Sequence, residues 1–343
     1  MKSTCRIWTA AVFLVLLHGA VFFCGFVAPY DTASQNRDFP YAPPTSLHFV
    51  DAEGHFHLRP FVYESEPAPA GVYEYQEVRG QAYPLEFFVR SAPYKIAGLI
   101  SSNTHLFGVT APAHIFLAGT DNYGRDEFSR ILAGGRISLA AGLAATGVSL
   151  FIAAFLGIVS GFYGRWWDES IMRAAELFLV LPWFYLLLAV RTFLPLHLDP
   201  LSAFFLLVGV IGTIGWAKPA RLIRGIVLGA RNRRFVLASR GFGASDPYIL
   251  RRHILPETFG VLLTQAALLV PQYVIAEVTL SFFGLGLSEP LPSWGNQLAN
   301  LQQYNVLVSY WWMFAPAAVL VIFCLSYFSF ANALQRKLES API

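Results

Sequence analysis

Six long apolar stretches recur along the chain, and their lengths predict six membrane-spanning helices. A helix needs about 20 mostly apolar residues to cross a bilayer. The fourth stretch is the shortest and needs flanking residues to reach that length. The first is longer than the roughly 7–15 apolar residues of a signal peptide, so we interpret it as an uncleaved anchor. The predicted spans are 7–28, 137–162, 170–190, 201–216, 261–287 and 310–333.

Basic residues gather on one side of these predicted spans. The loop at 217–257, called the basic loop below, carries nine Lys and Arg residues against two acids. Arg165 follows the second span, and Arg336 and Lys337 follow the sixth. An excess of Lys and Arg marks cytoplasmic loops. The pattern therefore predicts a multi-pass protein with both termini in the cytoplasm.

A long polar segment separates the first two spans. It contains twelve acidic and eight basic residues, with many Pro and Tyr. Strand-like composition occurs at 56–63, 72–78 and 85–89. We expect a small extracytoplasmic lobe of strands and loops, with an insert at about 48–114 that docks a binding protein or only decorates the outer face.

Composition supports a membrane protein. Of 343 residues, 55% are hydrophobic and 13% are charged, whereas soluble domains have about 25% charged residues. The mean hydropathy is +0.51. We predict an all-α membrane fold with one N-terminal helix, a five-helix core and the small lobe. The expected divisions are 1–29 (amino-terminal end and first span), 30–136 (extracytoplasmic segment), 137–336 (core) and 337–343 (cytoplasmic tail).

Local signals predict two short helices within the basic loop. The first covers 233–242 and ends at Gly243, because glycine accepts the left-handed conformation of a helix C′ residue. Asp246 is predicted to cap the second, with Pro247 at its first position, over 248–254. Pro256 lies beyond its predicted end. On spacing alone, a basic amphipathic hairpin on anionic lipid fits equally well.

The stretch 235–257, FVLASRGFGASDPYILRRHILPE, resembles the coupling motif of bacterial ABC importer permeases. That motif reads E-A-A, three residues, Gly, about nine residues, then an apolar-x-Leu-Pro sequence. Leu237 stands in place of its Glu, so docking here would rely on apolar contact. Ser239 stands in place of its second Ala. The positions that correspond to the motif or extend it are Ala238, Ser239, Gly243, Asp246, Pro247, Leu255 and Pro256.

Three more stretches, at 119–139, 161–173 and 280–298, resemble the dipeptide/oligopeptide/nickel branch of these permeases, in its second or C-type subunit. The resemblance implies half of a translocation pathway, completed by a second homologous permease. It implies two ABC ATPase subunits docked on the coupling loops. It also implies an extracytoplasmic solute-binding protein that delivers peptides or similar solutes, and a location in the bacterial cytoplasmic (inner) membrane. Neither a cofactor nor nucleic acid is expected.

Enzymatic motifs are missing from the sequence. There is no G-x-x-x-x-G-K-[ST], H-E-x-x-H or G-x-S-x-G pattern, so ATP hydrolysis would reside in partner subunits. Two alternatives remain open on the sequence. One is a membrane enzyme with an extracytoplasmic lobe. The other is a scaffold or sensor that docks cytoplasmic partners without transporting a solute.

Two further sets of residues carry weaker signals. Glu277 lies deep in the fifth span, where a charge costs at least ~2.5–3.5 kcal/mol, so it should face the bundle interior or water. A pathway contact and a structural partner fit it equally. Asp121, Arg125 and Asp126 precede the second span. We interpret them as a solvated turn and helix start, with mutual pairing or a binding-protein contact as the alternatives.

Three histidines, His48, His55 and His57, raise the question of a metal site. On a strand, His55 and His57 would point the same way. No Cys or further His follows at ligand spacing, so we expect ordinary loop histidines and no metal.

Overall fold

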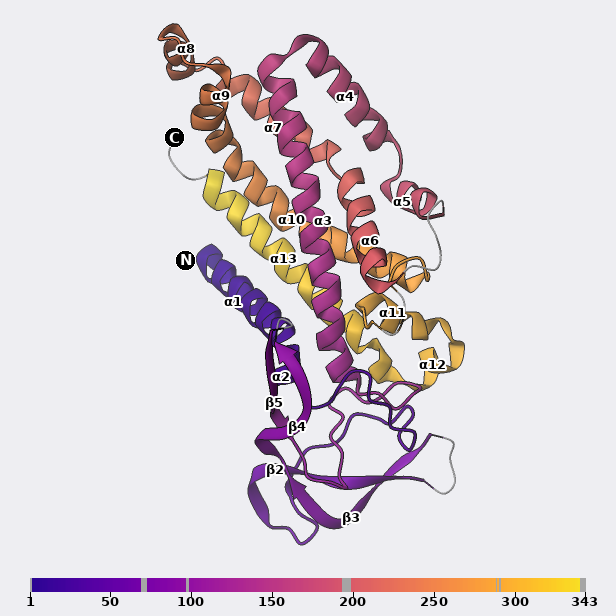
Figure 1. The fold of residues 1–343 in the computed structure, drawn as a ribbon. Coiled ribbons are helices and arrows are strands. Elements are labelled where there is room, and N and C mark those ends of the chain that lie inside the picture. Colours follow the sequence, from indigo (N-terminus) through magenta and orange to yellow (C-terminus); the bar gives the residue numbers. More distant parts are fainter. Residues whose placement is uncertain are drawn as a thin grey trace. The chain divides into compact units, whose positions relative to one another are not determined.

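The computed structural model describes residues 2–68, 73–96, 99–192, 199–287, 289 and 291–339. The chain divides into a helical unit (1–12, 139–280 and 323–343) and a mixed unit (13–138 and 281–322), and each is described separately. Figure 1 shows a predominantly helical chain with a smaller set of strands, which agrees with the predicted fold class. The predicted tail at 337–343 lies partly outside the described residues.

Helices occupy most of the predicted core. The helix bounds are α1 Lys2–Phe22, α2 Cys24–Val27, α3 Glu127–Tyr163, α4 Arg165–Val180, α5 Trp183–Thr192, α6 Pro200–Ile214, α7 Ala217–Ala230, α8 Arg234–Gly241, α9 Asp246–Ile249, α10 Leu255–Phe282, α11 Trp294–Ala299, α12 Tyr304–Ser309 and α13 Ala315–Glu339. A π-helix at Leu250–Ile254 joins α9 to α10.

Among the described residues, three helical segments are long and apolar enough to cross a membrane: Glu127–Tyr163, Asp246–Phe282 and Trp311–Arg336. Two helix pairs reach that length only together, and they are bent by 90° (α4 with α5) and 46° (α6 with α7). The apolar part of α1, Trp8–Phe22, is shorter. The structure thus supports three to five candidate spans by length and composition.

A proline follows the end of α4, and a close contact with Tyr273 requires glycine between α6 and α7. Helix α4 ends at Leu181, whose extended backbone precedes Pro182. Proline disfavours the helical conformation in the residue before it, so the helix stops there. Between α6 and α7, Gly215 lies so close to Tyr273 that an added Cβ would fall 1.7 Å from the tyrosine hydroxyl oxygen. Only glycine lets the backbone pass at this point.

The core of the helical unit lies where α3 and α4 meet the basic loop, which contains α7. Its buried residues include Ala153, Ile171, Trp216, Ile223 and Val227. Helices α3 and α7 approach closely because glycine faces α7: a Cβ at Gly161 would lie 2.7 Å from the Val227 Cβ. A larger residue at position 161 would push the two helices apart.

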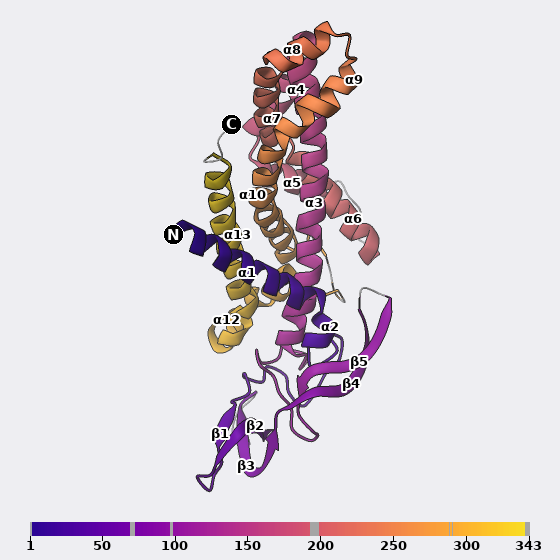
Figure 2. The same cartoon turned by 90° about the vertical axis from the view of Figure 1, so that its left-hand side faces the viewer.

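Among the described residues of 48–108, five strands form what we call the strand lobe, within the mixed unit. Their bounds are β1 His48–Val50, β2 Phe56–Pro67, β3 Tyr75–Pro84, β4 Glu86–Ile96 and β5 Ile100–Gly108. Strands β1, β2 and β3 form one antiparallel sheet in that order, and β4 pairs with β5. Figure 2 shows β4 and β5 as a separate hairpin beside α2, and both strands contact that helix.

The predicted strands are confirmed in part. The predicted stretch 56–63 falls in β2, and 85–89 falls largely in β4. Of the predicted stretch 72–78, residues 75–78 fall in β3, and residue 72 lies outside the described residues. The prediction missed β1 and β5. A small core that includes Val62, Tyr83, Leu85, Phe107 and Ile115 packs inside the lobe and the segment that follows it.

Candidate functional site

Gly243 ends α8 as the sequence predicts. Its φ is +83°, and no atom lies within 4 Å of the position where a Cβ would stand. The Gly243 amide donates to the carbonyl of Arg240 at 3.0 Å, and the next amide, of Ala244, donates to the carbonyl of Ser239 at 3.1 Å. This pair of bonds is a Schellman motif. The chain therefore reverses direction at a conformation that glycine adopts without strain.

The start of the second helix differs from the prediction by one residue. Ser245 occupies the N-cap, Asp246 is the first helical residue, and Pro247 follows it. The Ser245 side chain makes no capping hydrogen bond. Asp246 instead accepts a hydrogen bond from Arg240 at 3.4 Å, which ties α9 to α8. Asp246 thus links the two helices of the turn rather than capping the second.

Pro256 does not lie beyond the second helix, and this prediction is wrong. The helix runs from Asp246 to Phe282 as one candidate span. Proline has no amide hydrogen, and its ring clashes with the carbonyl four residues earlier. The chain accommodates it with the π-helix at 250–254, where the amide of Leu255 bonds to the carbonyl of Leu250. The basic loop therefore enters α10 without a break.

Apolar side chains anchor the basic loop in the core of the helical unit. Val236 on α8, Ile249 on α9 and Ile254 in the π-helix are buried in the same cluster as Ile223 and Val227 of α7. A fully buried aliphatic side chain contributes about 1.5–3 kcal/mol. Helices α8 and α9 are thus packed against α7.

Ion pairs close the same assembly. Arg233, just before α8, pairs with Glu257 at the start of α10 at 3.0 Å. The Arg240 guanidinium lies 5.4 Å from the centroid of the Phe162 ring at the end of α3. These contacts join the two ends of the turn and connect it to α3.

The stretch at 161–173 braces α7 from the side. Asp168 on α4 accepts two hydrogen bonds from Arg224 on α7, both at 2.6 Å. Arg231, at the end of α7, donates to the carbonyl of Gly161 at 2.9 Å. The stretch at 161–173, which resembles the permease family, therefore holds α7 just before the coupling-motif stretch at 235–257 begins.

Large apolar side chains of the basic loop remain exposed. Phe242, beside the Gly243 turn, is 93% exposed, and Leu237 is 54% exposed. Phe235 and Tyr248 are also exposed. We call these four residues the apolar docking set. Ala238 and Gly243 are exposed within the same turn. An exposed apolar group of this kind is typical of a protein-protein contact.

Asp121, Arg125 and Asp126 are buried, so the predicted solvated turn is wrong. Arg125 donates to Asp121 at 2.6 Å and to Glu289 at 3.1 Å. Arg130, also buried, donates to Glu289 at 2.7 Å. The alternative of mutual pairing holds for Asp121 and Arg125, whereas Asp126 bonds to Ser129. The sequence did not predict the contact of Arg130 with Glu289, because the two residues are 159 positions apart.

Two of the stretches that resemble the permease family, 119–139 and 280–298, meet in this cluster. Trp294 is buried and donates from its indole nitrogen to the carbonyl of Ile131 at 2.9 Å. Gln297 donates to the carbonyl of Arg130 at 2.8 Å. Asp126 accepts from the Ser129 amide at 2.9 Å, and burial raises the pKa of Asp126 to about 6. The segment 281–298 is thus fastened to the first turns of α3.

Glu277 is fully buried in α10, as its position in a span predicts. The side chain lies inside the helical unit rather than on its surface. It could meet a solute only if the bundle opened around it.

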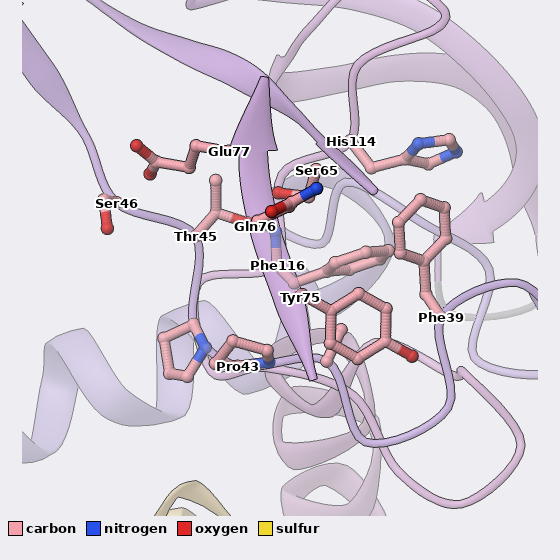
Figure 3. A pocket seen from close by; sticks show the side chains of 12 residues that line it. Phe39, Pro43, Thr45, Ser46, Ser65, Tyr75, Gln76, Glu77, His114 and Phe116 are labelled. Carbon is pink, nitrogen blue, oxygen red and sulfur yellow. Dashed lines mark hydrogen bonds between the residues drawn. The ribbon is translucent and has the colours of Figure 1, made fainter. Parts of the chain in front are cut away.

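A pocket in the mixed unit has aromatic walls and a polar rim (Figure 3). Phe39, Tyr75 and Phe116 line it together with His114 and Glu77, and with the solvent at its mouth it encloses about 600 Å³. Burial lowers the pKa of His114. Glu77 is already engaged, because its carboxylate oxygens lie 3.1 Å from the His48 Nε2 atom. His48 therefore belongs to an ion pair within the lobe.

Comparison with known proteins gives consistent matches. The family model for "binding-protein-dependent transport system inner membrane component" matches residues 153–340. The oligopeptide transport system permease protein OppC of Bacillus subtilis is 35% identical over 244 residues, which cover 70% of this chain and 75% of the relative. The dipeptide transport system permease protein DppC of the same organism is 34% identical over 222 residues, 64% of this chain and 67% of the relative. A chain of an inward-facing MetNI methionine ABC transporter is 18% identical with a TM-score of 0.45, covering 62% of this chain and 97% of that one.

Proposed function

This chain belongs to the family of binding-protein-dependent transport system inner membrane components, and from that premise we propose that its basic loop carries work from an ATPase to the helices of a peptide permease. The chain is a permease subunit of an ABC importer. It would form half of the pathway, with ATP hydrolysis located in partner subunits. The buried attachment of the loop is the observation that carries the proposal.

A rigid connection is what coupling requires. A partner that pushes on the exposed Phe242 or Leu237 would move the Gly243 turn with it. Val236, Ile249 and Ile254 pack that turn against α7, so the displacement passes to the core rather than being lost in a flexible loop. The Asp168–Arg224 bonds extend the rigid body to α4. Domain-scale switching proceeds through rigid-body movements of this kind.

Apolar contact replaces an ion pair in this proposal. Leu237 stands where the family motif has Glu, and its exposure leaves it available to a partner surface. The other three members of the apolar docking set enlarge the same kind of contact. Exposed arginines of the basic loop, Arg234, Arg251 and Arg252, would surround it with positive charge. The partner ATPase should therefore offer an apolar cleft with an acidic rim.

The assembly would contain a second homologous permease, two ABC ATPases and an extracytoplasmic solute-binding protein. We place it in the bacterial cytoplasmic membrane. Six spans would come from α1, α3, the α4–α5 pair, α6 with the start of α7, α10 and α13, with both termini and the rest of the basic loop in the cytoplasm. The divisions 1–29, 30–136, 137–336 and 337–343 follow from this arrangement. The strand lobe then lies outside, where a binding protein could reach it.

Peptides are the proposed substrates, because the relatives are named as dipeptide and oligopeptide permeases. A pathway role for Glu277 belongs to the same proposal. Its burial means that the helical unit must open before the carboxylate can meet a peptide amino group. A structural role for Glu277 would require no such opening.

Reconstitution tests the proposal. The chain, its partner permease, both ATPases and the binding protein are placed in liposomes, and ATP-driven peptide uptake is measured. Gly243→Pro should abolish uptake, because proline cannot adopt a φ of +83°, while membrane insertion stays normal. Gly241→Ala is the control, since Gly241 lies on α8 with no atom within 4 Å of an added Cβ. Normal uptake by Gly243→Pro would contradict the proposed coupling. A chain that binds the ATPases but supports no uptake would favour a scaffold.

A further inference from the structure

The turn between β1 and β2 places two carboxylates and two imidazoles within seven residues. The residues are Asp51, Glu53, His55 and His57. The Oδ1 atom of Asp51 accepts hydrogen bonds from the amides of His55 at 2.7 Å and Glu53 at 3.1 Å. Gly54, with φ +87°, closes the turn. The backbone thereby holds one oxygen of Asp51 and leaves the other directed at the side chains.

Both imidazoles converge on that second oxygen. The Nε2 atom of His57 lies 2.9 Å from Asp51 Oδ2, and the Nδ1 atom of His55 lies 3.4 Å from it. Ligand atoms of Asp51, Glu53 and His55 all lie within 4.8 Å of one another. The His57 ring is held in place by edge-on packing against Phe61, at 5.2 Å between centroids.

These separations match the spacing of ligands around one metal ion. Bonds from Zn²⁺ to imidazole nitrogen or carboxylate oxygen are about 2.0–2.2 Å long, so two ligands of a tetrahedral ion lie about 3.3–3.5 Å apart. The 3.4 Å between His55 Nδ1 and Asp51 Oδ2 falls in that range, whereas the 2.9 Å between His57 Nε2 and Asp51 Oδ2 is a hydrogen bond. A bound ion would replace that hydrogen bond and draw the His57 ring toward the ligand atoms of Asp51, Glu53 and His55.

We propose that Asp51, Glu53, His55 and His57 bind a divalent transition-metal ion at the tip of the β1–β2 hairpin. Two neutral imidazoles and two carboxylates suit Zn²⁺, Co²⁺ or Ni²⁺, whereas Ca²⁺ and Mg²⁺ prefer oxygen ligands alone. The two carboxylates neutralise the charge of the ion. His55 is 75% exposed and His57 45% exposed in their side chains, so an ion can enter from solvent. The bound ion would cross-link the turn to β2.

This inference revises the expectation of no metal. In the sequence no Cys or further His lies at ligand spacing, and the carboxylates of Asp51 and Glu53 meet the histidines only because the β1–β2 hairpin folds Asp51 back onto His57. His48, the third histidine of the lobe, does not join the site. It pairs with Glu77 and packs against Phe61 and Tyr63. His48 therefore provides a matched control.

Metal titration of the untagged full-length chain in detergent tests the proposal. Co²⁺ binding is followed by visible absorption, and Zn²⁺ binding by calorimetry. We expect saturation at one ion per chain. His55→Gln and His57→Gln should each weaken binding by at least ~10-fold, since loss of even an outer-shell partner costs about 10–100-fold. His48→Gln should bind as the wild type does.

Two results would overturn the site. One is the absence of saturable Co²⁺ or Zn²⁺ binding. The other is equal binding by the wild type and the His55→Gln/His57→Gln double variant. The exposure of His55 means that its single variant should fold normally, and equal thermal unfolding of the metal-free proteins checks this. Because the assay needs no ATPase, its outcome is independent of the proposed coupling.

Discussion

The backbone conformation at Gly243 follows from the residue itself, whereas the conformation around Pro256 depends on the residues packed near it. Gly243 has a left-handed backbone that its own chemistry allows, so its position in the turn could be predicted from the sequence. Pro256 is the opposite case. Taken alone it predicts a helix end, yet the π-helix at 250–254 absorbs the missing hydrogen bond and the helix continues. Packing of Ile249 and Ile254 into the core favours that continuous path.

Phe242→Ser should weaken binding of the partner ATPase. Phe242 is 93% exposed, so the change leaves the fold of the isolated chain intact. Burial of the phenyl ring on docking contributes about 1.5–3 kcal/mol to the binding free energy, so its removal should weaken the affinity roughly 10–100-fold. The measurement is titration of the purified ATPase against permease in nanodiscs. Leu58→Ser, at a 91% exposed position of the strand lobe, is the control. Equal affinities for the wild type and Phe242→Ser would exclude this ring from the interface.

Polar contacts within a helix and between helices have different origins in this chain. The Arg173–Glu176 pair on α4, at 3.3 Å, follows from helical spacing and is exposed. The Asp168–Arg224 pair is different, because its partners are 56 residues apart and belong to α4 and α7. Sequence spacing predicts contacts within a helix, whereas contacts between helices depend on how the helices pack.

Arg224→Lys should uncouple ATP hydrolysis from uptake. Lysine cannot reproduce the two parallel bonds that the guanidinium makes to Asp168. The pair is partly exposed, so the stability of the chain should fall by only about 1 kcal/mol. In reconstituted liposomes, we expect ATPase activity to persist while uptake falls severalfold. Arg221→Lys, at an exposed position on the same helix, should transport normally. Parallel losses of ATPase activity and uptake would argue against a bracing role.

A charged cluster in the mixed unit joins residues that are far apart in the sequence. The buried guanidinium groups of Arg125 and Arg130 pair with the buried Asp121 and with the half-exposed Glu289, which follows α10. An unpaired buried charge is costly, and removing one partner of such a pair typically destabilises a protein by about 3–5 kcal/mol. The cluster therefore brings together residues of the stretches at 119–139 and 280–298, both of which resemble the permease family.

Cysteine labelling tests the proposed orientation of the whole molecule. In a chain without Cys5, Cys24 and Cys324, Leu58→Cys should react with a membrane-impermeant maleimide in intact spheroplasts. Phe242→Cys should react only after permeabilisation, because the basic loop would be cytoplasmic. Both positions are exposed, so accessibility depends on the side of the membrane. Labelling of both sites in intact spheroplasts would contradict the arrangement of six spans.

The sequence by itself determined the membrane class, the family resemblance and the Gly243 turn. These depend on apolar length, on ordered motifs and on the backbone freedom of one residue, all of which are local. Only the tertiary structure decided the fate of Pro256, the burial of Asp121 and Arg125, and the convergence of His55 and His57 on Asp51. Each of these depends on contacts between residues that the fold brings together. The free energy of burying a charge or packing a core side chain depends on the residues around it, which the sequence does not show.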